Sequence, residues 1–497
     1  MQPSPLKWAV VFVPLLLCHA GCSAPSARLT FPLAPLATTG NTTWYDVNHD
    51  GKPDFGVRLG PDGRVDALLY DDLENGTVAR SYRLADYADS DVPHVILLLD
   101  SIPYHSVAER YAAGRLTFFG PPQKIIPPFP SLTEICYSSV LHCPPLTGMI
   151  DQSYDPKTRQ ARSAFWPRVW GYTQPWEQRC DYHATFYEDG LSFLHPRPWY
   201  AAELERARAA VDASPNRVTV VYLGSAASMV CKYGKPGVDE VLDGAEQLCL
   251  QLLYERHGAI KISMMADHGH NLMRSTNLPI AQYMTDAGFH PSDTLAAPND
   301  VFLEVNGLVT YAAIQTTQPV RVADALLSHP QIELAMYLDG NRVIVRSAAG
   351  SAAIECHDQR FRYVPIDGDV LGYQAIVQSL QAAGKADAQG FISDADWFDA
   401  TVDAEYPDAP RRLWDAFHAT AVDPPRVMFT TKDGYCAGLT GYEKYITMES
   451  THGGLNQINS ATFLMSMTDG RVTGPMRSRD ILSHIEPGFE PVAKGGK

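Results

Sequence analysis

The feature that most constrains the fold is a largely apolar segment, residues 259–266, which runs directly into Asp267-His268-Gly269. An apolar run of this length that ends in polar residues is typical of a buried strand. Open α/β sheets keep their binding sites at the carboxyl ends of such strands. A carboxylate beside an imidazole at that position suits a divalent cation such as zinc. Taken alone, however, a solvated Asp-His loop explains the two residues better than a metal site does.

Strand and helix patterns alternate along much of the chain. A near-continuous apolar run at 92–99 ends in Asp100, and a second buried strand is predicted at 217–223. Helices are predicted at 106–114, 201–212 and 238–257. This alternation indicates an α/β fold built on a doubly wound, mostly parallel sheet.

The pattern changes between residues 301 and 424. Short β-branched strands there flank a helix at 322–329. Further helices are expected at 375–383 and 394–400. We interpret this stretch as an inserted α+β cap subdomain. The main sheet is expected to resume with a strand near 425–431, so that the core domain comprises residues 92–300 and 425–497.

The N-terminal segment has the features of a secretory signal peptide covering residues 1–22. A basic residue precedes an apolar run at 8–18, and small residues lead to Cys22. The run is too short to span a bilayer. Ala20-Gly21-Cys22 resembles a bacterial lipobox, which would make Cys22 the lipidated first residue of the mature chain. His19 stands where that motif has an apolar residue, so secretion without a lipid is the alternative. We expect an exported protein that meets the membrane only through an acyl anchor.

A linker rich in Ser, Pro and Thr at 23–43 leads into a small β region at 44–91. At its start, oxygen-bearing side chains alternate around Gly51, a layout by which a short loop wraps calcium. The predicted calcium ligands are Asp46, Asn48, Asp50 and Asp54. The last acid comes too early for an EF-hand, and the loop looks more like those of bacterial β-rich surface repeats. An Asx-turn hairpin without calcium is the alternative.

Length and charge limit the functional classes. The 497 residues are too many for one ordinary domain but fit a large α/β domain with additions. The formal net charge of −16 argues against sequence-independent binding of nucleic acids, which requires a positively charged surface.

Seven cysteines follow Cys22, and an odd number leaves at least one thiol unpaired or metal-bound in an exported protein. The pairs nearest in sequence are Cys136 with Cys143 and Cys231 with Cys249. The sequence leaves the connectivity open.

Several short motifs follow one another in a specific order. Asp100 at a strand end is followed by the segment Pro-Phe-Pro-Ser-Leu-Thr-Glu at 128–134 with Leu-Thr-Gly at 146–148, by Asp267-His268-Gly269 and by Thr451-His452-Gly453. Together they resemble the alkaline phosphatase superfamily, and most closely its nucleotide pyrophosphatase/phosphodiesterase branch. The resemblance covers roughly residues 92–490. It implies an alkaline phosphatase-like fold and zinc-dependent hydrolysis of a phosphorylated small molecule, with diesters favoured.

The resemblance assigns a first metal site to Asp100, Thr133, Asp267 and His268. Thr133 would be the nucleophile at the start of a helix, where the helix N-terminus favours an anionic phosphoryl group. Without the resemblance, a helix N-cap role for Thr133 would be preferred. Ser131 is the runner-up nucleophile.

The second metal site of the family combines an Asp and a His four residues apart with a late His. His452 fits the late position. The segment at 222–234 matches the family pattern around the pair, but Ala227 stands at the Asp position and Cys231 at the His position. Both of these protein ligands are therefore changed.

Three interpretations follow from these changes. Cys231 thiolate and His452 hold a second zinc ion; or the enzyme works with one ion; or the protein no longer catalyses a reaction and binds a ligand or partner at the surface. Ligands could also come from His183, His270 or Asp239, which the sequence cannot place. Cys231 is explained equally well as a buried apolar side chain or as a disulfide partner of Cys249. Sulfatase activity is disfavoured. Sulfatases need a Cys or Ser within a specific sequence motif, and Thr133 is neither residue and has no such motif around it.

We therefore expect an exported, metal-dependent phosphoester hydrolase with one or two zinc ions and a calcium ion in the N-terminal loop. The alternative is a surface protein on the same fold that has lost its activity.

Overall fold

In the computed structural model, the described residues are 25–494 apart from 74, 89–90, 151, 164, 306, 439–445, 447 and 469–472. The predicted signal peptide and the lipidation site Cys22 lie outside these residues. No helix within the described ranges is both long enough and apolar enough to cross a membrane. The chain forms two compact units. We call them the parallel-sheet unit (within Cys22–Ile125, Thr173–Asp267 and Thr462–Lys497) and the large-sheet unit (within Ile126–Tyr172 and His268–Ala461).

The parallel-sheet unit is built on a six-stranded sheet. Its strand order is β10 (Val218–Leu223), β6 (His94–Leu99), β11 (Lys261–Ala266), β23 (Thr462–Ser466), β7 (Gln123–Ile126) and β24 (Met476–Arg477). β10 and β11 both pair with β6 in parallel, whereas β23 runs antiparallel to β11 and β7. Every residue of β6, β10 and β11 is buried. Burial on both faces explains why these strands are near-continuous apolar runs.

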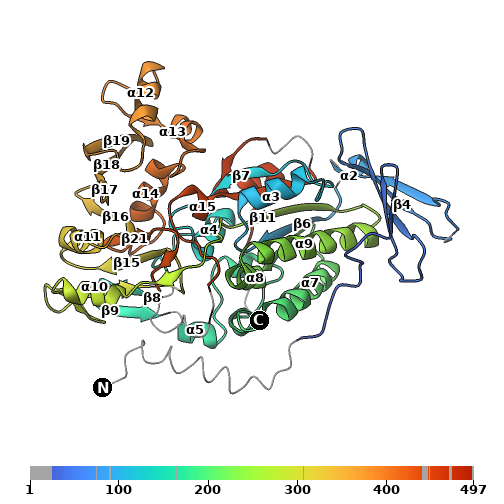
Figure 1. Ribbon diagram of the computed structural model, residues 1–497, viewed down its shortest axis with the longest axis horizontal. Helices are drawn as coiled ribbons and strands as arrows, with labels where there is room; N and C mark the ends of the chain where they lie inside the picture. Colours follow the sequence, from blue (N-terminus) through green and yellow to red (C-terminus); the bar gives the residue numbers. More distant parts are fainter. Residues whose placement is uncertain are drawn as a thin grey trace. The chain divides into compact units, whose positions relative to one another are not determined.

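Helices pack against this sheet; in Figure 1, α9 (Lys235–Glu255) lies next to β6, with α8 (Ser225–Tyr233) and α7 (Pro196–Ala213) beside it. The helices of the unit are α2 (Ala85–Ala88), α3 (Tyr104–Ala112), α6 (Phe186–Ser192), α7 (Pro196–Ala213), α8 (Ser225–Tyr233), α9 (Lys235–Glu255) and α16 (Ile481–Ile485). Buried residues of α9 recur every three or four positions, including Val238, Val241, Leu242 and Ala245. That spacing gives the helix one apolar face to lay on the sheet. The predicted α/β fold class is confirmed.

A small antiparallel sheet precedes this core in the same unit. Its strands are β1 (Ala37–Thr39), β2 (Thr42–Tyr45), β3 (Phe55–Leu59), β4 (Val65–Tyr70) and β5 (Arg80–Arg83), in that order. Phe55 packs edge-on against Tyr254 of α9, with ring centroids 5.3 Å apart. The Tyr70 hydroxyl donates to the Tyr254 carbonyl at 2.8 Å. The small β region predicted from the sequence is therefore docked on α9.

The large-sheet unit contains a nine-stranded sheet. The strand order is β13 (His290–Pro291), β14 (Asp300–Glu304), β15 (Tyr311–Gln315), β21 (Val427–Thr431), β16 (Ile332–Asp339), β17 (Arg342–Ser347), β18 (Gly350–His357), β19 (Arg360–Asp367) and β20 (Ile392–Ser393). The other elements of the unit are α4 (Thr133–Val140), β8 (Gln152–Asp155), β9 (Gln160–Ser163), α5 (Phe165–Val169), β12 (Thr276–Asn277), α10 (Ile280–Asp286), α11 (Pro319–Leu327), α12 (Gln374–Ala382), α13 (Asp394–Thr401), α14 (Ala409–His418), β22 (Tyr435–Cys436) and α15 (Gln457–Ser460).

Each face of this sheet carries its own apolar core. Met336 of β16 belongs to the core that includes Leu413 of α14, whereas its neighbour Ala335 belongs to the core that includes Leu326 of α11. Alternate residues of a strand point to opposite faces, so one strand serves both cores.

One expectation about strand pairing is wrong. Strand β21 was expected to return the chain to the parallel sheet, but it lies in the large sheet, antiparallel to both β15 and β16. The chain returns to the parallel sheet only at β23. An apolar run predicts a buried strand but carries no information about its partner. The division of the chain into domains at residues 301 and 424 stays a prediction.

Candidate metal centre

Two carboxylates lie together at the carboxyl end of the parallel sheet. Asp100 follows β6 and Asp267 follows β11, and these strands are paired in register up to Leu99 and Ala266. One carboxylate oxygen of Asp100 lies within 4.8 Å of one of Asp267. Both side chains are buried. Two buried acids at this separation repel one another unless a proton or a cation lies near them.

Both carboxylates are oriented by neighbours. The Ser101 amide donates to Asp267 Oδ1 at 3.0 Å, and its hydroxyl donates to Asp100 Oδ1 at 2.6 Å. Ser101 adopts a left-handed backbone conformation, with φ at 68°, which is uncommon for serine. The Tyr222 hydroxyl donates to Asp100 Oδ2 at 2.5 Å. Burial and the nearby carboxylates, including Asp100, raise the pKa of Tyr222, so it stays a neutral donor. Sequence reasoning did not single out Ser101 or Tyr222 for these roles.

The large-sheet unit holds two imidazoles that lie face to face. His268 and His452 stack with ring centroids 3.9 Å apart. His268 Nδ1 donates to the Gly269 carbonyl at 3.0 Å, which leaves Nε2 as the basic nitrogen. His268 Nε2 lies 3.5 Å from Thr133 Oγ1. Burial lowers the pKa of His268 to about 4, so the ring is neutral near pH 7 and suited to bind a metal ion.

Thr133 is the first residue of α4. The N-cap position belongs to Leu132, which makes no side-chain cap. The N-cap role considered for Thr133 is therefore wrong. Thr133 is partly exposed, whereas Ser131 is fully buried. Of the two hydroxyls considered as nucleophiles, the one on Thr133 is the more accessible to a substrate.

Ser131 instead holds other parts of the site. Its carbonyl accepts a hydrogen bond from His452 Nδ1 at 3.0 Å, and its hydroxyl accepts one from Arg412 Nη2 at 3.1 Å. Arg412 also donates to Ser460 Oγ at 2.7 Å and to the Leu455 carbonyl at 2.9 Å. A buried guanidinium thus ties the segment before Thr133 to the segment after His452.

The expected second-site pair on α8 offers at most one ligand atom. Ala227 has no ligand atom. Cys231 is buried, and burial together with Asp100 raises the pKa of its thiol, whereas a metal ligand must be a thiolate. Cys249 carries a free thiol, so the Cys231–Cys249 disulfide is not formed.

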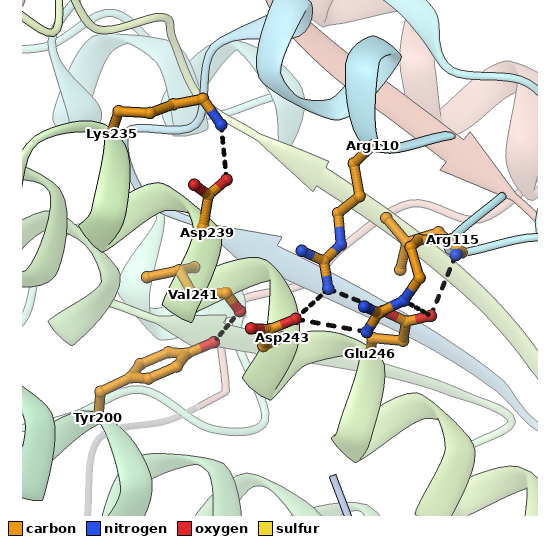
Figure 2. A network of polar contacts seen from close by, with 9 residues as sticks. Arg110, Arg115, Tyr200, Lys235, Asp239, Val241, Asp243 and Glu246 are labelled. Atoms are coloured by element: carbon orange, nitrogen blue, oxygen red, sulfur yellow. Dashed lines mark hydrogen bonds and ion pairs between the residues drawn. The ribbon is translucent and has the colours of Figure 1, made fainter. Parts of the chain in front are cut away.

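The three residues considered as replacement ligands differ in their surroundings. Asp239 pairs with Lys235 at 2.6 Å on the exposed side of α9 (Figure 2). His183 Nδ1 donates to the Ala184 carbonyl at 2.8 Å. His270 is fully buried, and its ring centroid lies 5.1 Å from that of His452. Of the three, His270 therefore lies beside a predicted second-site ligand.

The predicted calcium loop joins β2 to β3. Asp46 accepts the amides of Asp50 at 3.1 Å and Gly51 at 2.8 Å. Asp54 accepts the Asn48 amide at 3.0 Å and the Asn48 side-chain amide at 3.2 Å. Gly51 has φ at 90°, a conformation that favours glycine. The four predicted ligands are thus held in one tight loop.

No protein-family model matches the chain, and no curated protein sequence matches it. Among solved structures, it is similar to murine ectonucleotide pyrophosphatase/phosphodiesterase 5, with a TM-score of 0.44 and 10% identity over 82% of this chain and 97% of that one. The human enzyme of the same name gives 0.43 and 11%. An inactive variant of the murine enzyme in complex with AMP gives 0.43 and 10%. The last two comparisons cover the same shares of both chains.

Proposed function

We propose that the protein is a zinc-dependent phosphoester hydrolase that prefers diesters and uses Thr133 as its nucleophile. One observation carries the proposal: Thr133 Oγ1, at the first residue of α4, lies 3.5 Å from the basic nitrogen of His268. A hydroxyl and an imidazole nitrogen this close together can bind the same metal ion, and coordination to a metal ion is one way in which a hydroxyl nucleophile is activated. The order of motifs resembling the nucleotide pyrophosphatase/phosphodiesterase branch supports the same assignment.

The donor set suits zinc. Asp100, Asp267 and His268, with Thr133, would hold the ion through oxygen and nitrogen atoms, the ligand types that zinc takes in catalytic sites. Asp267 and His268 are consecutive in the chain. When bound, the ion would supply Lewis-acid stabilisation of charge on the phosphoryl oxygens and favour the deprotonated form of a coordinated hydroxyl.

The protein's own residues would carry the following steps. Thr133 Oγ attacks phosphorus as the bond to the leaving alcohol breaks; the threonine proton ends on that alcohol, and Thr133 is left esterified to the remaining phosphomonoester. The amides of the first turn of α4 face the negative charge of the transferred group. Water then attacks phosphorus, the bond between Thr133 Oγ and phosphorus breaks, Thr133 regains its proton, and the phosphomonoester is released. Ser101 and Tyr222 keep the two carboxylates in place throughout.

A second candidate function has its own support. The changes at Ala227 and Cys231 remove two expected ligands from α8, which favours a protein that binds a phosphorylated ligand without hydrolysing it. This alternative predicts ligand binding without turnover, so one assay distinguishes the two.

The test compares purified wild-type protein with Thr133→Ala and Thr133→Ser in the presence of zinc, on bis-p-nitrophenyl phosphate and p-nitrophenyl phosphate. We expect wild-type turnover to exceed that of the alanine variant by about 10³-fold or more, with the serine variant in between. Thr158→Ala, an exposed threonine in the β8–β9 turn, is the matched control and should match wild type. Absent wild-type turnover, or turnover that survives Thr133→Ala, would overturn the proposal.

We also propose that the loop between β2 and β3 binds one calcium ion through Asp46, Asn48, Asp50 and Asp54. Calcium would replace the loop's own amide donors at these oxygens. Isothermal titration should show one equivalent of calcium per chain, and Asp54→Asn should abolish it. Unchanged binding in that variant would refute the assignment.

Export and lipidation at Cys22 are proposed from the sequence pattern alone. Metabolic labelling with a radioactive fatty acid should mark the wild-type protein and not Cys22→Ser. If neither the wild-type protein nor Cys22→Ser were labelled, secretion without a lipid would be the correct interpretation.

A further inference from the structure

The large-sheet unit offers a histidine in place of the one that position 231 lacks. We propose that His270 and His452 bind a second zinc ion, separate from the ion assigned to Asp267 and His268. The catalytic meaning of this site rests on the proposed function, but ion binding itself can be measured without it. The site draws on residues that the sequence separates by 182 positions, from 270 to 452.

The spacing of the two rings fits a shared ion. With a zinc–nitrogen bond of about 2 Å and about 1.1 Å from nitrogen to ring centre, two imidazoles at a tetrahedral angle have centroids about 5 Å apart. The His270 and His452 centroids are 5.1 Å apart, and the ring planes are inclined by 44°. The pair is therefore already at the separation that a common ion requires.

The neighbouring pair does not fit a shared ion. His268 and His452 have centroids 3.9 Å apart and nearly parallel planes, 14° from one another. Ligation of one ion by both would force a nitrogen–metal–nitrogen angle of roughly 75°, far below the tetrahedral value. His268 and His452 consequently belong to different ions, and His270 is the imidazole left to accompany His452.

The outer contacts of both rings suit ligation through Nε2. His452 Nδ1 donates to the Ser131 carbonyl at 3.0 Å. His270 Nδ1 pairs with Ser450 Oγ, an oxygen that also accepts the Leu272 amide at 2.9 Å. Metal-binding histidines use the second ring nitrogen in this way, and the contact sets which nitrogen faces the metal.

The two segments that carry these histidines are joined by hydrogen bonds. The Asn271 amide donates to the Thr451 carbonyl at 2.9 Å, and Asn271 Oδ1 accepts the Thr451 amide at 2.9 Å. The His452 carbonyl accepts the Thr310 amide at 2.7 Å. Gly269, just before His270, has no space for a side chain, because an added Cβ would lie 2.6 Å from the Ile458 carbonyl oxygen. The relative position of the two rings is therefore set before any ion binds.

The experiment measures zinc per chain by elemental analysis after dialysis against buffered zinc. We expect two equivalents in the wild-type protein, and one each in His270→Asn and His452→Asn. His183→Asn is the control and should keep two. One equivalent in wild type, or two in His270→Asn, would overturn the proposal.

Two further variants separate this result from other failures. Thr133→Ala removes one of the four proposed ligands of the first ion and none of the second, so it should keep two zinc ions at saturating zinc while losing turnover. Two zinc equivalents in a wild-type protein without turnover would refute the proposed function and leave this site in place. Because His270 is buried, its replacement could unfold the chain, which circular dichroism would show. Ser450→Ala keeps both imidazoles and removes only the outer contact of His270. It should weaken the second zinc equivalent by about 10- to 100-fold. An unchanged affinity in this variant would count against the proposed site.

Discussion

His452 stacks face to face on His268, with ring centroids 3.9 Å apart and planes 14° from parallel. The two rings nevertheless have different partners. His268 faces Thr133 Oγ1 through Nε2, whereas His452 is held from Nδ1 by the Ser131 carbonyl. The stack thus brings His268, the neighbour of Thr133, against a ring that is oriented by a different part of the chain.

The two rings should differ in their effect on activity. We expect His268→Asn to lower kcat/KM by about 10³-fold or more, because it removes both a ligand and the neighbour of Thr133. His452→Asn should leave measurable activity, because the first set of ligands stays complete. Steady-state kinetics on bis-p-nitrophenyl phosphate, with zinc content measured on the same samples, tests this. Equal losses in both variants would contradict the separation of roles.

Arg412 is expected to matter for both stability and the site. Its guanidinium is buried, and it donates to Ser131 Oγ, Ser460 Oγ and backbone carbonyls. Arg412→Met leaves these buried acceptors without a donor and should lower the free energy of unfolding by about 3 kcal/mol. Urea unfolding measures the loss. Arg342→Met, which removes an exposed arginine from β17, is the control and should change stability little.

Glu304 should make the protein less stable as the pH rises. It is fully buried, and burial raises its pKa to about 8. In the unfolded chain, its pKa is about 4.3. Between these two values the folded state binds the extra proton, so the free energy of unfolding falls as pH rises, by up to about 1.4 kcal/mol per pH unit. Below a pH of about 4.3, Glu304 is protonated in both the folded and the unfolded chain, so its contribution to the free energy of unfolding no longer changes with pH.

Glu304→Gln removes this titration while keeping a side chain of similar shape. The wild-type Tm should therefore fall further than that of the variant between about pH 5 and about pH 9. Glu109→Gln, at an exposed position on α3, should behave as wild type. Parallel pH profiles for Glu304→Gln and wild type would show that Glu304 is ionised in the folded protein.

The sequence predicted the parallel core well for a physical reason. Strands buried on both faces must be apolar throughout, and an amphipathic helix must repeat every three or four residues, so β6, β11 and α9 leave strong patterns. Pairing partners leave no such pattern. Strand β21 is as apolar as a core strand, but its neighbours β15 and β16 are distant in sequence.

The residues of the candidate site also differ in how well the sequence predicted them. Asp100 and Asp267 could be predicted because each follows a strong strand pattern. The hydrogen bond from Tyr222 to Asp100 depends on two strands lying side by side, which the pattern of either strand alone does not contain. His270 could be considered as a ligand from the sequence, but its position beside His452 depends on how two distant loops meet.

Arg110 of α3 and Arg115, just after α3, meet two acids of α9, Asp243 and Glu246 (Figure 2). Arg110 Nη2 contacts Asp243 and lies 2.9 Å from Glu246 Oε2. Arg115 Nη2 lies 2.7 Å from the same oxygen, and the Leu116 amide donates to Glu246 Oε1 at 3.1 Å. The side chains of Arg110 and Glu246 are only 12% and 10% exposed. Glu246 therefore neutralises the guanidinium groups of Arg110 and Arg115 at a site that is largely shielded from water.

Removal of Glu246 should cost far more stability than removal of an exposed acid on the same helix. Glu246→Ala leaves Arg110 a buried charge with Asp243 as its remaining partner, and breaking a buried ion pair in this way costs about 3 kcal/mol or more. Asp239 of α9 pairs with Lys235 where both side chains are about half exposed, at 47% and 45%. Such exposed pairs contribute at most about 0.5 kcal/mol, so Asp239→Ala is the matched control. Guanidinium chloride unfolding at low and high ionic strength measures both variants. If the two variants lost equal stability, the buried cluster would contribute no more than a surface pair, and α3 would be held to α9 by apolar packing alone.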